Sequence, residues 1–279
     1  MKSFSRNNRL LWLLIPSALA AGAFLVGQTE FSSSFSGRTP FTLHLREEST
    51  AVKGGTPLSR ATFVAVRFDG SRAWGDAMYA DNPAPFTGVR TVALAPEQVS
   101  VVLDRALRIK TTYLLTGPDL SETPRDPSCK TPQVDPRVQY VVKGEETVLG
   151  VPAVVIEYRH DDAIRTQWEA PSLNCETIKL MEEIIAGGEV VKRFERSPLE
   201  IQLGEPSADL FAIPAEYVEK SPMQKQIMRA QVAGRPMDPR WMQGIEREDA
   251  RYYTLLEKAH AAGKLPAGLQ HILFERRFR

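Results

Sequence analysis

The sequence is poor in the residues that usually carry catalysis and metal binding. Its 279 residues include two cysteines and four histidines. There is no Gly-x-Ser-x-Gly or Ser-x-x-Lys nucleophile pattern, no His-Glu-x-x-His zinc motif and no Gly-x-x-x-x-Gly-Lys phosphate loop. Neither cysteine has the nearby cysteine or histidine that thiolate metal sites usually bring. We therefore expect no enzyme, metal or cofactor, and a hydrolase with a dispersed site is the remaining catalytic alternative.

The chain also lacks an excess of charge of either sign. Lysine and arginine total 35 against 34 aspartate and glutamate residues, which leaves a net charge of +1. A near-neutral chain has no general electrostatic attraction for nucleic acid, so we expect no nucleic-acid partner. The hydrophobic fraction of 43% is ordinary for a globular protein, and the length suffices for one large β-type domain with its own core.

The N-terminus has the layout of a secretory signal peptide. Basic residues come first, the apolar run 10–15 (LLWLLI) follows, and Ala18-Leu19-Ala20 supplies the small-x-small pattern of a cleavage site. We predict a signal peptide over 1–27, cleaved after Ala20, and a Ser-rich tether over 28–39. The uncharged run 10–26 leaves an uncleaved N-terminal anchor as the alternative. The sequence thus predicts a protein exported from the cytosol, to the periplasm or cell envelope.

Cys129 and Cys175 are predicted to form one disulfide. An exported chain with two cysteines most simply pairs them, because the compartment is oxidising. Closing a loop of about 46 residues contributes at most about 4 kcal/mol in the chain-entropy account. A redox-active pair or half of a metal site is the functional alternative.

Alternating apolar and polar residues predict strands over most of the chain. Phe41, Leu43 and Leu45, for example, alternate with polar neighbours. Asp69-Gly70 and Gly187-Gly188 separate such runs and predict hairpin turns. About ten strands follow one another with no crossover helix, which favours an antiparallel meander.

This pattern defines a β domain over 40–220, interrupted by one long loop. Residues 116–137 contain five prolines, a density that excludes a central strand. Such a loop is either functional or a structural lid over a sheet edge, and both readings stay open.

The character changes to helical in the last part of the chain. Residues 222–232 predict a short helix, and a longer one with a charged outer side follows and ends at Gly263. We interpret 221–279 as a helical C-terminal extension. A cluster of basic residues at its end offers contact with an anionic membrane surface: Arg276, Arg277 and Arg279.

Three segments resemble a known superfamily. They are 144–150 (GEETVLG), 168–171 (WEAP) and 206–217 (PSADLFAIPAEY). Together with the strand pattern, they resemble exported bacterial proteins of the LolA/LolB/LppX lipoprotein-carrier type. The resemblance implies a half-barrel, a large curved antiparallel sheet that holds acyl chains beneath covering helices. The extension over 221–279 departs from that type.

These observations predict an exported, non-catalytic cell-envelope protein that binds a lipid, another hydrophobic ligand or a protein partner through a curved β-sheet. Five strand residues are candidates for the apolar concave face: Phe63, Val64, Val66, Phe68 and Val89. The same residues would be plain core if a helix packs on them. A scaffold or an exported sensor part that docks through its C-terminal helices is the alternative function.

Overall fold

The computed structural model of the chain describes residues 38–51, 58–76, 88–115, 126–131, 138–160, 162–232, 234 and 239–277. All of them belong to one compact unit, formed by 35–115 and 124–279. A second compact unit, 1–34 with 116–123, lies outside the described residues. The predicted signal peptide or anchor, nearly all of the Ser-rich tether and most of the proline-rich loop therefore also lie outside them.

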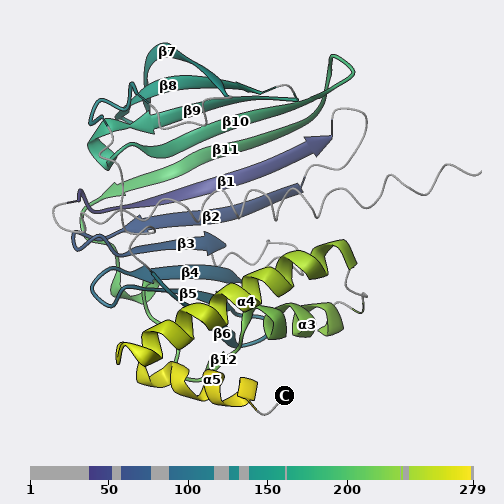
Figure 1. Cartoon of the computed structure of the whole chain (residues 1–279). Coiled ribbons are helices and arrows are strands. Elements are labelled where there is room, and N and C mark those ends of the chain that lie inside the picture. The colour runs from purple at the N-terminus through teal and green to yellow at the C-terminus, as the bar shows by residue number, and fades with distance from the viewer. Residues whose placement is uncertain are drawn as a thin grey trace, which may run out of the picture. The chain divides into compact units, whose positions relative to one another are not determined.

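Within the described residues, one curved sheet of twelve strands dominates the structure (Figure 1). The strands are β1 (Phe41–Ala51), β2 (Leu58–Val66), β3 (Arg72–Asp76), β4 (Val89–Leu94), β5 (Val99–Asp104), β6 (Ile109–Leu114), β7 (Gln139–Val148), β8 (Val151–His160), β9 (Ala163–Ala170), β10 (Glu176–Ala186), β11 (Glu189–Leu203) and β12 (Val218–Glu219). All neighbours pair antiparallel except β12, which runs parallel to β6. The expected mainly β fold with a large curved antiparallel sheet is confirmed.

The sheet consists of two meanders rather than the single one expected. The spatial order is β12-β6-β5-β4-β3-β2-β1-β11-β10-β9-β8-β7. The chain leaves β6 near one edge, and β7 forms the other edge. The return to the centre is made by β11, which pairs with β1 from Phe41–Leu203 to Ala51–Lys192. The expectation of a single meander is wrong because β11, the longest strand, pairs with β1. No local sequence pattern specifies that partner.

The two predicted hairpin turns are present. Gly70 has φ 84°, and the amide of Arg67 donates to the carbonyl of Ser71 across the turn. Gly187 and Gly188 have φ 62° and 80° between β10 and β11. Glycine is favoured at these positions because a left-handed backbone carries no Cβ penalty there.

Three α-helices follow the sheet in the described chain: α3 (Pro222–Val232), α4 (Pro239–Ala261) and α5 (Gln270–Arg277). The predicted bounds of α3 are confirmed, and Gly263, with φ 68°, follows the end of α4. A short 3-10 helix at Pro171–Leu173 lies between β9 and β10. Among the described helices, none combines the length and apolar character needed to cross a bilayer.

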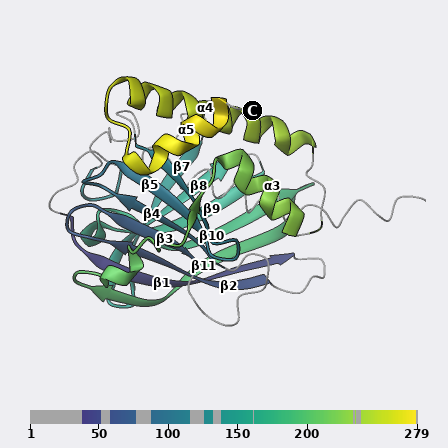
Figure 2. The ribbon, with the colours of Figure 1, turned by 90° about the horizontal axis from the view of Figure 1, so that it is seen from below.

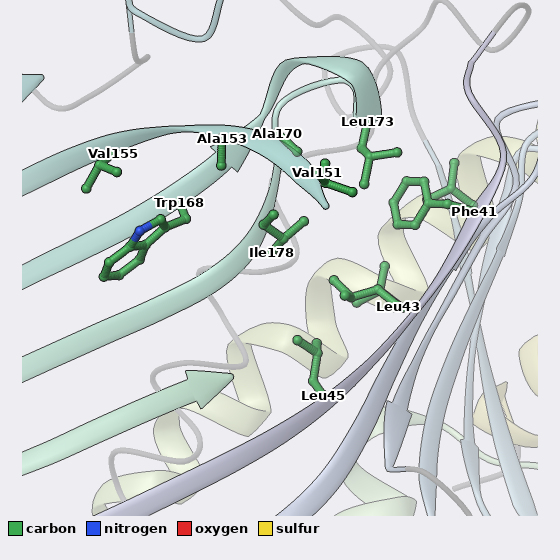
Figure 3. Close-up of a cluster of buried hydrophobic side chains, with 12 residues drawn as sticks. Phe41, Leu43, Leu45, Val151, Ala153, Val155, Trp168, Ala170, Leu173 and Ile178 are labelled. Carbon is green, nitrogen blue, oxygen red and sulfur yellow. The ribbon is translucent and has the colours of Figure 1, made fainter. Parts of the chain in front are cut away.

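The inner face of the sheet carries an apolar cluster that joins strands far apart in sheet order. Side chains from β1 and β2 pack with others from β8, β9 and β10. Figure 3 shows those of β1 opposite those of β8, β9 and β10. Its buried members are Phe41, Leu43, Leu45, Val64, Val66, Val151, Ala153, Val155, Trp168, Ala170, Leu173 and Ile178. Contact between such distant strands identifies this face as the one toward which the sheet curves.

The helices cover the same inner face at the β4–β6 end. One row of paired residues crosses β2 to β5 on this face: Val64, Trp74, Thr91 and Val102. Asp104 lies two residues beyond Val102 and binds Arg229 of α3. Both α3 and α4 contact β6, and Figures 1 and 2 show them beside this end of the sheet.

A second apolar cluster lies on the outer face. It contains Phe63, Ala65, Ala73, Val92, Val99, Val101, Leu103 and Phe211. Residues of the segment 205–217 cover it, including Leu210, Ile213 and Tyr217. The segment that carried part of the sequence resemblance therefore covers this part of the outer face.

Candidate functional site

The five residues expected to line a ligand face do not share one face. Val64 and Val66 lie in the inner cluster, whereas Phe63 lies in the outer one, because successive residues of a strand point to opposite sides. Phe68 sits in the turn after β2 and is 59% exposed. Val89 is half-buried and pairs with Asp104, so it faces the helices. The structure thus brings together Val64 and Val66 and leaves Phe63 and Phe68 apart from them.

The inner face becomes charged where the apolar row of β1 ends. Glu47 continues the row of Phe41, Leu43 and Leu45, yet it is a carboxylate whose side chain is 4% exposed. It accepts hydrogen bonds from the guanidinium groups of two neighbouring strands: the Nε atoms of Arg60 and Arg196 lie 2.7 Å and 3.0 Å from its oxygens.

Asp76 on β3 extends this charged cluster. Its Oδ1 lies 3.6 Å from Nη1 of Arg60, and its Oδ2 accepts from the amides of Gly88 and Val89 at 3.2 Å. We name Glu47, Arg60, Asp76 and Arg196 the charge clamp. It ties β11, β1, β2, β3 and the start of β4 together on the inner face.

The two carboxyl groups of the charge clamp have pKa values that move in opposite directions. Burial alone would raise the pKa of Glu47, but the charges of Arg196 and Arg60 hold it below its ordinary value. Burial raises the pKa of Asp76 above its ordinary value, against the charge of Arg60. Pairs of carboxyl groups whose pKa values are shifted in opposite directions occur in the acid–base sites of enzymes. Here every carboxylate oxygen already faces an arginine or a backbone amide, which favours a structural role.

A second polar region lies between the helices and β5–β6. The Nε of Arg229 on α3 donates to Asp104 at 2.6 Å, and the hydroxyl of Tyr113 on β6 donates to Glu248 on α4 at 2.7 Å. The rings of Tyr113 and Tyr252 meet edge to face at 5.7 Å between centroids. These contacts hold the two helices to the inner face.

Lys225 stands out in this region. It belongs to α3, is 7% exposed and places Nζ 5.9 Å from the centroid of the Tyr113 ring. Within the described part of the chain, its ammonium makes no hydrogen bond or ion pair. Burial lowers the pKa of Lys225 to about 8, helped by the charge of Arg229 and opposed by Glu248 and Asp104. The carboxylates of Glu248 and Asp104 attract the ammonium without contacting it, and an anion in contact would favour its charged form further.

The hydroxyl of Tyr252 is a second buried polar group in the same region. It finds no hydrogen-bond partner among the described residues. Burial raises the pKa of Tyr252 far above its ordinary value, so this hydroxyl stays protonated and is available as a donor. An acceptor from outside the chain would satisfy it.

The two edges of the sheet differ. β12 pairs with β6 along one edge, whereas β7 pairs with β8 and forms the other edge along ten residues. Nearly every residue of β7 is exposed, including Tyr140, Val141 and Val142. An exposed edge strand with consecutive apolar residues is a template for pairing with another chain.

The structure joins Cys129 and Cys175, as predicted, with their Cα atoms 5.6 Å apart. The bond links the segment 126–131 to the turn after β9, and it is buried with Val154 and Ile156 on the face of β8 that points away from the inner cluster. Glu169 is the unexpected neighbour. One of its carboxylate oxygens and both sulfur atoms lie within 4.8 Å of one another.

Of the three basic residues expected to contact a membrane, the structure describes the side chain of Arg276. Its guanidinium donates to Glu257 at 3.1 Å and stacks over the ring of Tyr253 at 4.5 Å. Arg276 therefore fastens α5 to α4. The side chain of Arg277 and all of Arg279 lie outside the described residues.

No family model matches the sequence, and no curated protein does either. Among solved structures, an uncharacterized conserved protein from Thermus thermophilus is similar, with 13% identity and a TM-score of 0.38 over 72% of this chain and 98% of that one. The MucA/MucB complex of Pseudomonas aeruginosa matches with 15% identity and a TM-score of 0.38, over 72% of this chain and 64% of that one.

A LolA superfamily protein from Nitrosomonas europaea also matches, with 9% identity and a TM-score of 0.31 over 69% of this chain and 97% of that one. The type named by the sequence motifs is thus among the structures that this chain resembles. With TM-scores below 0.5, these likenesses carry no argument about the site, which is argued from the chain's own residues.

Proposed function

We propose that this chain is an exported cell-envelope protein that binds an amphiphile with an anionic head group, and that it acts by binding rather than by catalysis. The observation that carries the proposal is Lys225, a lysine that is 7% exposed and makes no ion pair within the described chain, held between α3 and the inner face of the sheet. A carboxylate or phosphate head group would supply the missing partner.

The surroundings of Lys225 suit the two ends of such a ligand. The unpartnered hydroxyl of Tyr252 offers a hydrogen-bond donor in the same helix–sheet region. Val89 and Val102 present apolar surface on the inner face nearby, and the helix–sheet contact of Tyr113 with Glu248 is exposed. We place the head group at Lys225 and the tail along the inner face, where it would separate the helices from β4–β6.

Export is supported by two independent features. The N-terminal sequence has the layout of a signal peptide, and the chain's two cysteines form a buried disulfide. Both fit the periplasm or cell envelope, where amphiphiles are abundant.

The test uses palmitate as the probe and Lys225→Met as the variant. Methionine keeps the length and apolar stem of the side chain but removes its charge. Because hydrogen bonds to charged groups contribute about 1.5–3 kcal/mol, we expect palmitate binding to weaken at least about tenfold. Lys258→Met is the matched control, because Lys258 is exposed on α4. Equal palmitate affinity of Lys225→Met and the parent protein would contradict the proposal.

Stability tests the burial of Lys225 independently of ligand binding. The folded-state pKa of Lys225, about 8, lies below the ordinary 10.5, so the unfolded chain binds more protons between these values. The stability of the parent protein therefore rises with pH across this window, while Lys225→Met lacks that rise. At neutral pH we expect the ligand-free variant to be more stable by about 2–3 kcal/mol.

A second candidate function is supported by β7. We propose that its open edge adds an extended segment of an envelope protein, with apolar residues opposite Tyr140 and Val142. A synthetic peptide of that pattern should shift the backbone amide resonances of β7, and Val141→Pro should abolish the shifts by removing a backbone donor. Shifts that persist in the variant would rule out edge pairing.

A further inference from the structure

The surroundings of the disulfide have the composition of a metal site. Cys129, Cys175 and Glu169 come from three separate segments, and their sulfur and oxygen atoms lie within 4.8 Å of one another. All three residues are buried, with exposures of 3%, 4% and 4%. One carboxylate oxygen beside two sulfur atoms, all from buried residues, is a mixed donor set that suits a borderline metal ion.

The environment of these three residues also fits a metal site. Val154 and Ile156 of β8 pack around the two sulfur atoms and limit access of water. The hydroxyl of Tyr158 lies 3.5 Å from Oε1 of Glu169 and can donate to it. Hydrogen bonds to a ligating carboxylate and an apolar shell are the features that orient ligands and tune a bound metal.

We propose that the disulfide conceals a metal site: in the reduced protein, the thiolates of Cys129 and Cys175 and the carboxylate of Glu169 bind one divalent ion of the zinc class. Two sulfur ligands and one oxygen ligand favour a borderline ion over calcium or magnesium, which prefer all-oxygen sites. Three protein ligands leave one tetrahedral position open for water or another small ligand.

The disulfide-bonded state and the metal-bound state exclude each other chemically. A dithiol reduces the disulfide by two successive exchanges, in which its two sulfurs lose two electrons and form its own disulfide, while Cys129 and Cys175 become thiols. The divalent ion then displaces the two thiol protons, and two metal–sulfur bonds form. The sulfur–sulfur bond must be broken first, because thiolates are the metal-binding form of cysteine.

A divalent ion would compensate the charges that reduction creates at the two sulfur atoms. Deprotonation of Cys129 and Cys175 would place two negative charges in a buried volume, and the two positive charges of the ion match them. The metal therefore makes deprotonation of the buried thiols favourable. It also opposes disulfide formation, since the ion must leave before the sulfurs can pair.

The experiment uses the full mature chain, reduced with dithiothreitol, desalted under anaerobic conditions and titrated with Co²⁺ and then Zn²⁺. We expect a thiolate-to-cobalt charge-transfer absorption at one Co²⁺ per chain, which one equivalent of Zn²⁺ removes. Reduced protein loaded with Zn²⁺ should re-form its disulfide at least about tenfold more slowly than metal-free protein in the same oxidant. The oxidised protein should show no charge-transfer band.

Two variants separate the proposed ligands. Glu169→Gln keeps the side-chain volume but removes the charge. We expect Zn²⁺ binding to weaken at least about tenfold, the size of effect seen when residues around a metal site are mutated. Glu200→Gln, an exposed change on β11, serves as the control. Replacement of both cysteines by serine should abolish the cobalt band while leaving the far-ultraviolet dichroism of the sheet in place.

Several results would overturn the proposal. One is a reduced, folded protein that gives no charge-transfer band with Co²⁺. Another is a Glu169→Gln variant that binds Zn²⁺ as tightly as the parent, because the carboxylate would then not be a ligand. If reduction unfolds the protein, Zn²⁺ should restore its dichroism and cooperative unfolding, and failure to do so would equally exclude the site.

Discussion

Removing the carboxylate at the centre of the charge clamp should destabilise the sheet in a pH-dependent way. The perturbation is Glu47→Gln, which keeps the volume of the side chain and removes its charge. The two arginines then lose their common anion. Loss of one partner of a buried ion pair costs about 3–5 kcal/mol. Arg60 and Arg196 are 27% and 32% exposed, so water replaces part of the loss, and we expect about 2–3 kcal/mol.

The pH dependence follows from the lowered pKa of Glu47. A carboxyl group whose folded-state pKa lies below its unfolded value of 4.5 contributes stability that is fully present above 4.5. That contribution is lost as the pH falls through the folded-state value. The difference in unfolding free energy between the parent protein and Glu47→Gln should therefore be full at neutral pH and shrink below pH 4.5.

Urea unfolding monitored by far-ultraviolet dichroism measures this difference. Glu48→Gln is the matched control, because Glu48 is the next residue of β1 and is exposed. The reasoning is refuted if Glu47→Gln costs no more than Glu48→Gln, or if the difference keeps its neutral value in acid.

Other expected outcomes follow from single features of the structure. Gly75→Ala should cost at least about 3 kcal/mol in thermal unfolding, because a Cβ there would lie 2.2 Å from a backbone carbonyl oxygen of β4 at φ 148°, whereas Gly268→Ala meets nothing within 4 Å. Replacement of Cys129 and Cys175 by serine should lower stability by about 2–4 kcal/mol, and neither thiol of the unreduced, unfolded parent should react with a maleimide. N-terminal sequencing of protein from the envelope should start after the Ala-Leu-Ala site rather than at the initiating methionine.

Local patterns in the sequence predict the elements of this fold well. Period-two alternation is a property of neighbouring residues, so the strands through β11 and the turns at Gly70 and Gly187 were identifiable. The helix α3 begins at a proline and was predicted with its observed bounds. The partnership of β1 with β11, and the two-residue strand β12, depend on contacts between distant parts of the chain and had no local pattern.

The site was less predictable than the fold, for identifiable reasons. Phe63 and Val64 are adjacent in a strand, so they could not both line one face, and alternation already contained that information. Lys225 looks like any surface lysine of a short helix, since its burial against Tyr113 arises from how α3 meets β6. Glu169 comes close to the cysteines because β9 and the turn after it bring them together, which no spacing in the sequence indicates.

Native mass spectrometry of the protein released gently from the cell envelope tests the central claim most directly. The account predicts a species heavier than the mature chain by the mass of one amphiphile with an anionic head group, which is lost on collisional activation and is missing from Lys225→Met. A parent protein that appears at its sequence mass alone, or a Lys225→Met variant that carries the same extra mass, would contradict it.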